Sequence, residues 1–182
     1  MTMDLIRLSA RSVRDLLKNR QVGPLELLDA LEHRISEVDG AVNALPTLCF
    51  ERARQRARES DLSGLPLAGI PVAIKDLLPV SGVRTTFGSM AYRDHIPKVS
   101  DLLVERIEAA GGIVYAKSNT PEFGAGANTF NDVFGFTRNP WNTALSAAGS
   151  SGGSAVALAT GMAWLATGSD LGGSLRTPAS FC

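Results

Sequence analysis

The sequence predicts an α/β protein in which helices cover the faces of a sheet. Two short apolar runs, residues 70–74 and 113–116, stand among segments with helical spacing of apolar residues, and such alternation is typical of this fold class. The composition agrees, because 45% of the residues are hydrophobic and 20% are charged, as in ordinary globular chains. No repeat or linker divides the chain, so we expect one domain over residues 1–182.

The first third of the chain is expected to be helical. Ser9 is a suitable N-cap for a helix at residues 9–20, and Pro24 is tolerated in the first turn of a second helix at residues 24–40. A third helix is expected at about residues 48–60, where alternating arginines form a solvated face.

After this helical segment, residues 1–64, we expect residues 65–182 to form an α/β core. Apolar runs bounded by turn residues predict strands, and capped periodic stretches predict helices. The expected elements are a strand at residues 70–74, a helix capped by Ser100 and closed by Gly111, a strand at residues 113–116, a helix at residues 152–162 and a strand at residues 164–167.

Charge and cysteine content argue against several classes of function. Eighteen basic residues balance 18 acidic ones, so no positive field favours nucleic acid or an anionic membrane. The longest apolar run, residues 155–166, is too short to span a bilayer. Cys49 and Cys182 form neither a disulfide framework nor a metal-ligand pattern, which favours a reducing cytoplasm. We expect no metal and no cofactor.

The last quarter of the chain is the most informative segment. Seven of the 18 glycines lie between Gly149 and Gly173, mixed with serines. Glycine lets a backbone approach a ligand closely, so this density predicts a site made of main-chain amides. Serine hydroxyls among such amides favour nucleophilic chemistry beside an anion-stabilising pocket.

Two catalytic arrangements could use these serines. Residues 149–153 fit the Gly-x-Ser-x-Gly elbow with Ser151 as nucleophile, but both histidines precede the elbow, whereas its acid and histidine normally follow it. A lysine base is the alternative, and Lys75 and Lys117 each end an apolar strand. Periodicity alone does not choose between these two lysines.

Several ordered motifs together resemble the amidase signature family. They are Ile70-Pro71-Val72-Ala73-Ile74-Lys75-Asp76, Asn139-Pro140-Trp141, Gly149-Ser150-Ser151-Gly152-Gly153-Ser154 and Gly168-Ser169-Asp170-Leu171-Gly172-Gly173-Ser174-Leu175-Arg176. The likeness covers nearly the whole chain from residue 65 onward. It implies an α/β fold with a mixed sheet flanked by helices, and hydrolysis of carboxylic amides by a Ser-Ser-Lys triad.

The resemblance implies three catalytic residues. Ser174 matches the acyl-forming nucleophile, Ser150 matches the bridging serine that follows a cis peptide bond, and Lys75 matches the base. The cis bond is then expected between Gly149 and Ser150. The side chains of Lys75, Ser150 and Ser174 are expected to form one hydrogen-bonded chain.

The same resemblance implies a substrate site. The amides of Leu171, Gly172, Gly173 and Ser174 match the oxyanion hole, and Gly124 falls where the family lines the acyl pocket. The implied substrate is a small-molecule amide, which is cleaved to an acid and ammonia or an amine.

The chain ends a few residues after Ser174, whereas members of the family continue well beyond that point. The resemblance therefore implies the N-terminal portion of an amidase domain, truncated after the nucleophile segment. Two other functions stay open. One is the amidotransferase A subunit, which liberates ammonia from glutamine for a tRNA-bound substrate. The other is an inactive fragment whose exposed sheet edge binds another chain, and a homodimer is possible.

Overall fold

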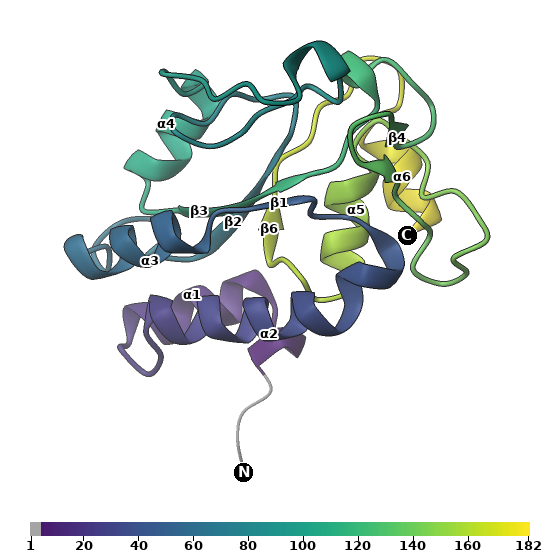
Figure 1. Cartoon of the computed structure of the whole chain (residues 1–182). Helices are drawn as coiled ribbons and strands as arrows, with labels where there is room; N and C mark the ends of the chain where they lie inside the picture. Colours follow the sequence, from purple (N-terminus) through teal and green to yellow (C-terminus); the bar gives the residue numbers. More distant parts are fainter. Residues whose placement is uncertain (1–4) are drawn as a thin grey trace.

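The computed structural model describes residues 5–182, so the first four residues of the expected segment 1–64 lie outside the described part. Helices and short 3-10 turns surround a four-stranded sheet (Figure 1). The helices are α1 Ala10–Lys18, α2 Pro24–Val42, α3 Phe50–Glu59, α4 Leu102–Ala109, α5 Gly152–Ala159 and α6 Arg176–Phe181. The strands are β1 Thr47–Leu48, β2 Pro71–Lys75, β3 Ile113–Ser118, β4 Phe130–Asn131, β5 Gly135–Phe136 and β6 Leu165–Ala166. The 3-10 turns are η1 Leu5–Arg7, η2 Met90–Tyr92 and η3 Glu122–Gly124.

The sheet is mixed, which confirms the expected fold class. Its strand order is β1-β3-β2-β6, with β3 and β6 parallel to β2 and with β1 antiparallel to β3. β2 and β3 are buried along their whole length, because helices cover both faces of a sheet of this kind. In Figure 1, α1 and α2 lie below the strands and α4 lies above them. α5 packs against β6 and β2.

One irregularity in the sheet changes where side chains point at its end. The register between β2 and β3 shifts by one residue between Val72 and Ala73, so Tyr115 is an extra residue in β3. Successive side chains in a strand alternate between faces. After the bulge, each residue of β3 therefore lies on the opposite face, relative to its neighbours in β2, from the face it would have in a regular register. Tyr115 is fully buried, packs its ring on Phe50 at 5.6 Å and donates its hydroxyl proton to Met162 O.

The expectation that Ser100 caps α4 is wrong. The helix begins later, and the Asp101 carboxylate accepts a hydrogen bond from Leu103 N at 2.8 Å. A carboxylate at this position also interacts favourably with the positive end of the helix dipole. Ser100 Oγ instead accepts a hydrogen bond from Ser81 N at 2.9 Å, which ties down the segment after β2.

Two other helix boundaries differ from the expected ones. The third helix begins at Phe50 rather than at Leu48, because Thr47 and Leu48 pair with β3 and form β1. The helix expected to reach residue 162 ends at Ala159, shortly before Gly161 adopts a φ of +74°. A residue with positive φ cannot continue a right-handed helix, and glycine adopts this conformation without a steric cost.

Gly153 marks the place where α5 meets the segment after β3. A β-carbon there would lie 2.4 Å from Asn119 N and 2.6 Å from Asn119 O, which are backbone atoms without room to move. Gly153→Ala is therefore expected to lower the free energy of unfolding by about 2–3 kcal/mol in a urea titration. Gly40→Ala in α2 is the matched control, because a β-carbon there meets nothing within 4 Å. It is expected to stabilise the protein by about 0.5–1 kcal/mol, and equal urea midpoints for the two variants would contradict this packing.

Candidate active site

Lys75, the last residue of β2, lies at the centre of a cluster of hydroxyl groups. Its side chain is fully buried, and Nζ donates to Ser150 Oγ at 2.7 Å, to Ser151 Oγ at 2.9 Å and to Ser169 Oγ at 2.9 Å. Ser150 and Ser151 directly precede α5, and Ser169 follows β6, so three separate segments meet at this lysine. The first link of the expected hydrogen-bonded chain, from Lys75 to Ser150, is confirmed.

Two of these hydroxyls were not assigned to the lysine by sequence reasoning. Ser151 enters the sequence interpretation as an elbow nucleophile, and Ser169 has no expected role. Ser151 Oγ donates to Ser169 O at 3.3 Å, and Ser169 N donates to Ser151 Oγ at 3.3 Å, so the two residues are bonded to each other. Their only signal in the sequence is position, because Ser151 follows Ser150 and Ser169 precedes Asp170 in the second glycine–serine motif.

The peptide bond between Gly149 and Ser150 is cis, as expected. Gly149 lies against the neighbouring chain segment, where a β-carbon would approach Asn128 N and Gly126 O at 3.0 Å each. Glycine is therefore required for this close approach. Ser150 itself is 1% exposed, so its hydroxyl faces Lys75 rather than solvent.

Ser174 lies near the cluster but does not join its hydrogen bonds. Ser151 N donates to Ser174 O at 3.1 Å, which brings the two backbones together. Among residues 5–182, however, the Ser174 hydroxyl makes no hydrogen bond to Ser150 or to Lys75. The expectation of one continuous chain is therefore wrong at its second link. The physical reason lies in the loop that carries Ser174, which is held by a different set of contacts.

Asp170 organises that loop, residues 170–176. Its carboxylate accepts hydrogen bonds from the backbone N–H groups of Gly173 at 2.7 Å, Leu175 at 3.1 Å and Arg176 at 3.3 Å. The Arg176 guanidinium adds two hydrogen bonds of 3.0 Å each. Chiefly because of Arg176, the pKa of Asp170 lies well below its ordinary value. An ionised carboxylate thus folds the loop into the turn that leads into α6.

The amides expected to form an oxyanion hole are partly free. Within the described part of the chain, the N–H groups of Leu171, Gly172 and Ser174 donate to no protein acceptor. The Gly173 N–H is occupied by Asp170. Unpaired amides in a glycine-containing turn can bind an anionic oxygen, so three of the four expected donors are available for this purpose.

Gly124 lies beside the end of β2. It closes η3 with a φ of +70°, and a β-carbon there would lie 3.0 Å from Leu77 Cδ2. Leu77 follows Lys75 by two residues. The fold therefore brings Gly124 close to the strand end that carries the lysine.

The bulge in β3 separates the two strand-end lysines. In the observed register Lys75 pairs with Ser118, and Lys117 pairs with Ile74. Paired neighbours share a face and successive residues alternate, so the side chains of Lys75 and Lys117 leave the sheet on opposite faces. If Tyr115 paired with Ala73 in a regular register, Lys75 would pair with Lys117 and the two side chains would lie side by side.

Lys117 belongs to a fully buried ion pair. Its Nζ lies 3.1 Å from Asp76 Oδ1 and donates to Leu78 O and Thr85 Oγ1 at 2.8 Å each. Asp76 Oδ2 in turn accepts hydrogen bonds from Thr86 N at 3.0 Å and Thr86 Oγ1 at 2.6 Å. The contacts that the structure gives Lys117 are with this carboxylate and its surroundings, whereas those of Lys75 are with serine hydroxyls.

The histidines lie elsewhere. His33 on α2 pairs with Glu37 at 3.2 Å, and His95 stacks on Phe87 with ring centroids 6.1 Å apart. Among residues 5–182, neither histidine forms a hydrogen bond with Ser151, so the elbow arrangement lacks its base there. The geometry favours lysine over histidine as the group that takes a proton from serine.

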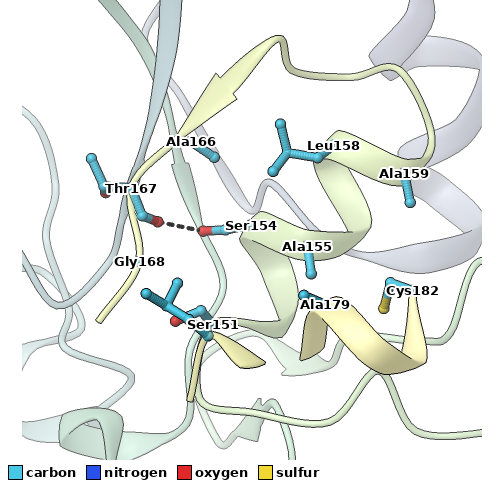
Figure 2. A pocket seen from close by; sticks show the side chains of 11 residues that line it. Ser151, Ser154, Ala155, Leu158, Ala159, Ala166, Thr167, Gly168, Ala179 and Cys182 are labelled. Atoms are coloured by element: carbon cyan, nitrogen blue, oxygen red, sulfur yellow. Dashed lines mark hydrogen bonds between the residues drawn. The ribbon is translucent and has the colours of Figure 1, made fainter. Parts of the chain in front are cut away.

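An apolar cavity of about 410 Å³ adjoins the hydroxyl cluster (Figure 2). Ser151 lines this cavity and also accepts the hydrogen bond from Lys75. On the α5 wall, the Ser154 hydroxyl is already paired, because it donates to Thr167 O at 2.7 Å. The rest of the wall comes mostly from small apolar residues of α5, β6 and α6, so the space is suited to an apolar group.

A buried lysine, serine hydroxyls and free main-chain amides are the groups found in serine hydrolases that use lysine instead of histidine. The family described as Amidase matches residues 26–182. The chain therefore belongs to the amidase signature family, whose members hydrolyse amides.

Individual relatives agree with this membership. In Methylacidiphilum infernorum, the A subunit of glutamyl-tRNA(Gln) amidotransferase is 43% identical over 180 residues, which cover 99% of this chain and 36% of the relative. The structure of 6-aminohexanoate cyclic dimer hydrolase matches with a TM-score of 0.89 at 36% identity, covering 97% of this chain and 37% of that one. A bacterial aryl acylamidase matches with a TM-score of 0.87 at 32% identity, covering 94% of this chain and 37% of that one. The chain thus spans little more than a third of the length of each.

Proposed function

We propose that this chain carries the base and the nucleophile of an amide hydrolase that works through an acyl-enzyme. Lys75 is the base, Ser150 the bridging serine and Ser174 the nucleophile. The observation that carries this proposal is the buried Lys75 amine, which contacts Ser150 at 2.7 Å beside the Gly149–Ser150 cis peptide. Membership of the amidase signature family supports the same reaction.

The mechanism moves two protons in sequence. Neutral Lys75 takes the proton of Ser150, Ser150 takes that of Ser174, and Ser174 Oγ attacks the amide carbonyl. This step requires the Ser174 hydroxyl to come within hydrogen-bond distance of Ser150 when substrate is bound, as catalytic hydrogen bonds often tighten in the substrate complex. The N–H groups of Leu171 and Gly172 then hold the oxyanion, an effect of about 3 kcal/mol for each such donor. The proton returns through Ser150 to the leaving amine, and water releases the acid.

Gly173, Ser174 and Gly124 complete the proposed substrate site. The Ser174 N–H is a third free oxyanion donor, whereas Gly173 can join only if its N–H leaves the Asp170 carboxylate. Gly124, which lies beside Leu77 at the end of β2, forms part of the wall that receives the acyl group.

The rate of acylation is expected to rise with pH. Burial lowers the pKa of Lys75 to about 8, although the charge of Asp170 opposes this shift. Below this pKa the amine is protonated and accepts no proton, so acylation by an activated ester is expected to be slow at about pH 6 and to level off above about pH 9. Lys75→Met is expected to remove this pH-dependent limb, whereas Lys98→Met at the surface keeps it. A wild-type rate that stays constant across this pH range would rule out Lys75 as the base.

A panel of three amides tests the proposed function on the 182-residue chain. Glutamine, an aliphatic amide and an aryl amide are incubated with the protein, and the released ammonia or amine is measured together with the mass of any acyl adduct. We expect release from the simple amides and an adduct on the peptide that contains Ser174. If no amide is cleaved and no adduct forms, the proposal fails and the inactive fragment remains.

A second candidate is the glutamine-hydrolysing role of an amidotransferase A subunit. The 43% identity to a protein of that name favours it. Release of ammonia from glutamine, with little from the other two amides, would establish this alternative.

The proposed setting is cytoplasmic, with a small-molecule amide as the partner. Cys49 and Cys182 are both free thiols, which fits a reducing compartment. Over residues 5–182, no helix combines the length and the apolar character needed to cross a membrane. We also propose that segments 1–64 and 65–182 form one domain, because α3 packs on β3 through the contact between Phe50 and Tyr115.

A further inference from the structure

The Lys75 amine has three hydroxyl neighbours, which is one more than a neutral amine can donate to. An ammonium group carries three N–H donors and has no lone pair, so hydrogen bonds to Ser150, Ser151 and Ser169 satisfy it completely. A neutral amine carries two N–H donors and one lone pair. To act as a base, Lys75 must keep two hydroxyls as acceptors and turn its lone pair toward the third.

Ser151 is limited to the role of acceptor. Its hydroxyl donates to Ser169 O at 3.3 Å, and a hydroxyl has one proton to donate. The Ser151 oxygen therefore has only lone pairs to offer, and these accept from Lys75 Nζ and from Ser169 N. One N–H of the neutral amine is thus assigned to Ser151.

The remaining N–H goes either to Ser150 or to Ser169. Ser150 makes the shorter contact, 2.7 Å against 2.9 Å, and is 1% exposed. Ser169 is half-buried, and within residues 5–182 its hydroxyl forms a hydrogen bond with Lys75 and with no other residue. A Ser169 oxygen that accepts the second N–H leaves the lone pair facing Ser150.

We propose that Ser169 is a positioning residue of the lysine base. Together with Ser151, it accepts the two N–H bonds of neutral Lys75 and so aims the lone pair at the proton of Ser150. This inference rests on the proposed function, in which Ser150 gives that proton to Lys75.

Charged groups around Lys75 also influence its pKa, so they must be considered when a change in the Lys75 titration is attributed to a substitution at Ser169. Asp170 is the neighbouring carboxylate, and it is paired with Arg176. Asp76 and Lys117 form their own ion pair on the opposite face of the sheet. α5, which packs against β2, contains no charged side chain. A substitution at Ser169 leaves all these charges in place, so a shift in titration reports the lost hydrogen bond.

Ser169→Ala is expected to lower kcat for a simple amide about tenfold with KM changed less than about twofold, because the lone pair is no longer directed. The midpoint of the pH profile is expected to fall by roughly half a unit, because the ammonium form loses more from a missing acceptor than the amine does. Ser169→Thr keeps the hydroxyl and is expected to restore both values. Ser180→Ala on α6 is the matched control, since the Ser180 hydroxyl donates to Thr177 O at the surface.

A second measurement does not depend on turnover. The chain has four lysines, Lys18, Lys75, Lys98 and Lys117, so lysine ¹³Cε NMR signals can be assigned by single substitutions. The Lys75 signal is expected to titrate at lower pH in Ser169→Ala and at the wild-type pH in Ser169→Thr. Identical Lys75 titrations in all three proteins, or equal loss of kcat in the alanine and threonine variants, would overturn the proposal. A wild-type chain that cleaves no amide would instead overturn the proposed function, and the NMR comparison would still decide the role of Ser169.

Discussion

Ser174→Ala is expected to abolish acylation at every pH between about 6 and 10. No covalent intermediate forms without the Ser174 oxygen, and removing a catalytic serine lowers kcat by roughly 10⁶-fold in a well-studied serine protease. The measurement is a single-turnover reaction with an activated ester, followed by mass spectrometry of the Ser174 peptide. The loss should be independent of pH, unlike that in Lys75→Met, because it removes the nucleophile rather than the base.

Ser151 provides the decisive comparison. If Ser151 were the nucleophile of an elbow, Ser151→Ala would lose the adduct and Ser174→Ala would keep it. We expect the reverse, with slower acylation in Ser151→Ala and the adduct still on Ser174, because Ser151 accepts a hydrogen bond from Lys75. Ser180→Ala, which replaces an exposed serine of α6, should react at the wild-type rate.

Lys117→Met is expected to lower the free energy of unfolding by about 3–5 kcal/mol, a large part of the stability of a domain of this size. Among residues 5–182, the substitution leaves Thr86 as the one remaining donor to the buried Asp76 carboxylate, and it removes the hydrogen bond to Leu78 O. Equilibrium unfolding in urea at neutral pH measures the change. A variant that fails to fold would show that the loss exceeds the whole free energy of unfolding of the protein.

Two further variants separate charge from packing. Replacing both partners, Asp76→Asn with Lys117→Met, is expected to cost less than Lys117→Met alone, because no unpaired charge remains. Lys98→Met removes an exposed lysine and should stay within about 0.5 kcal/mol of the wild type. If Lys117→Met also stayed within that range, the buried ion pair would not be a stabilising contact.

Much of the fold could be predicted from the sequence. The apolar runs at residues 70–74 and 113–116 predicted β2 and β3, because strands buried on both faces consist almost entirely of apolar residues. Periodicity predicted the main helices, although the N-cap of α4 is Asp101 rather than Ser100. The β4–β5 hairpin, in which the rings of Phe130 and Phe136 stack at 5.0 Å, was missed because two-residue strands have no detectable period.

The sequence by itself determined the family, through ordered motifs that contain Lys75, Ser150 and Ser174. The motifs implied Lys75 as the base, but the periodicity of the sequence did not show why Lys75 rather than Lys117 contacts the serines. That choice depends on the extra residue Tyr115, which shifts the register by one and sends Lys117 to the face opposite Lys75.

The hydroxyl cluster was likewise decided by the tertiary structure. Ser169 reaches Lys75 from 94 residues away, and Ser151 reaches it from 76 residues away. Local periodicity reports which face of a helix or strand is buried, but it contains no information about which distant segments meet. Strand pairing and the packing of α5 and β6 bring these groups together. The sequence pattern predicts which faces are apolar, but only the tertiary structure determines which apolar faces pack against each other.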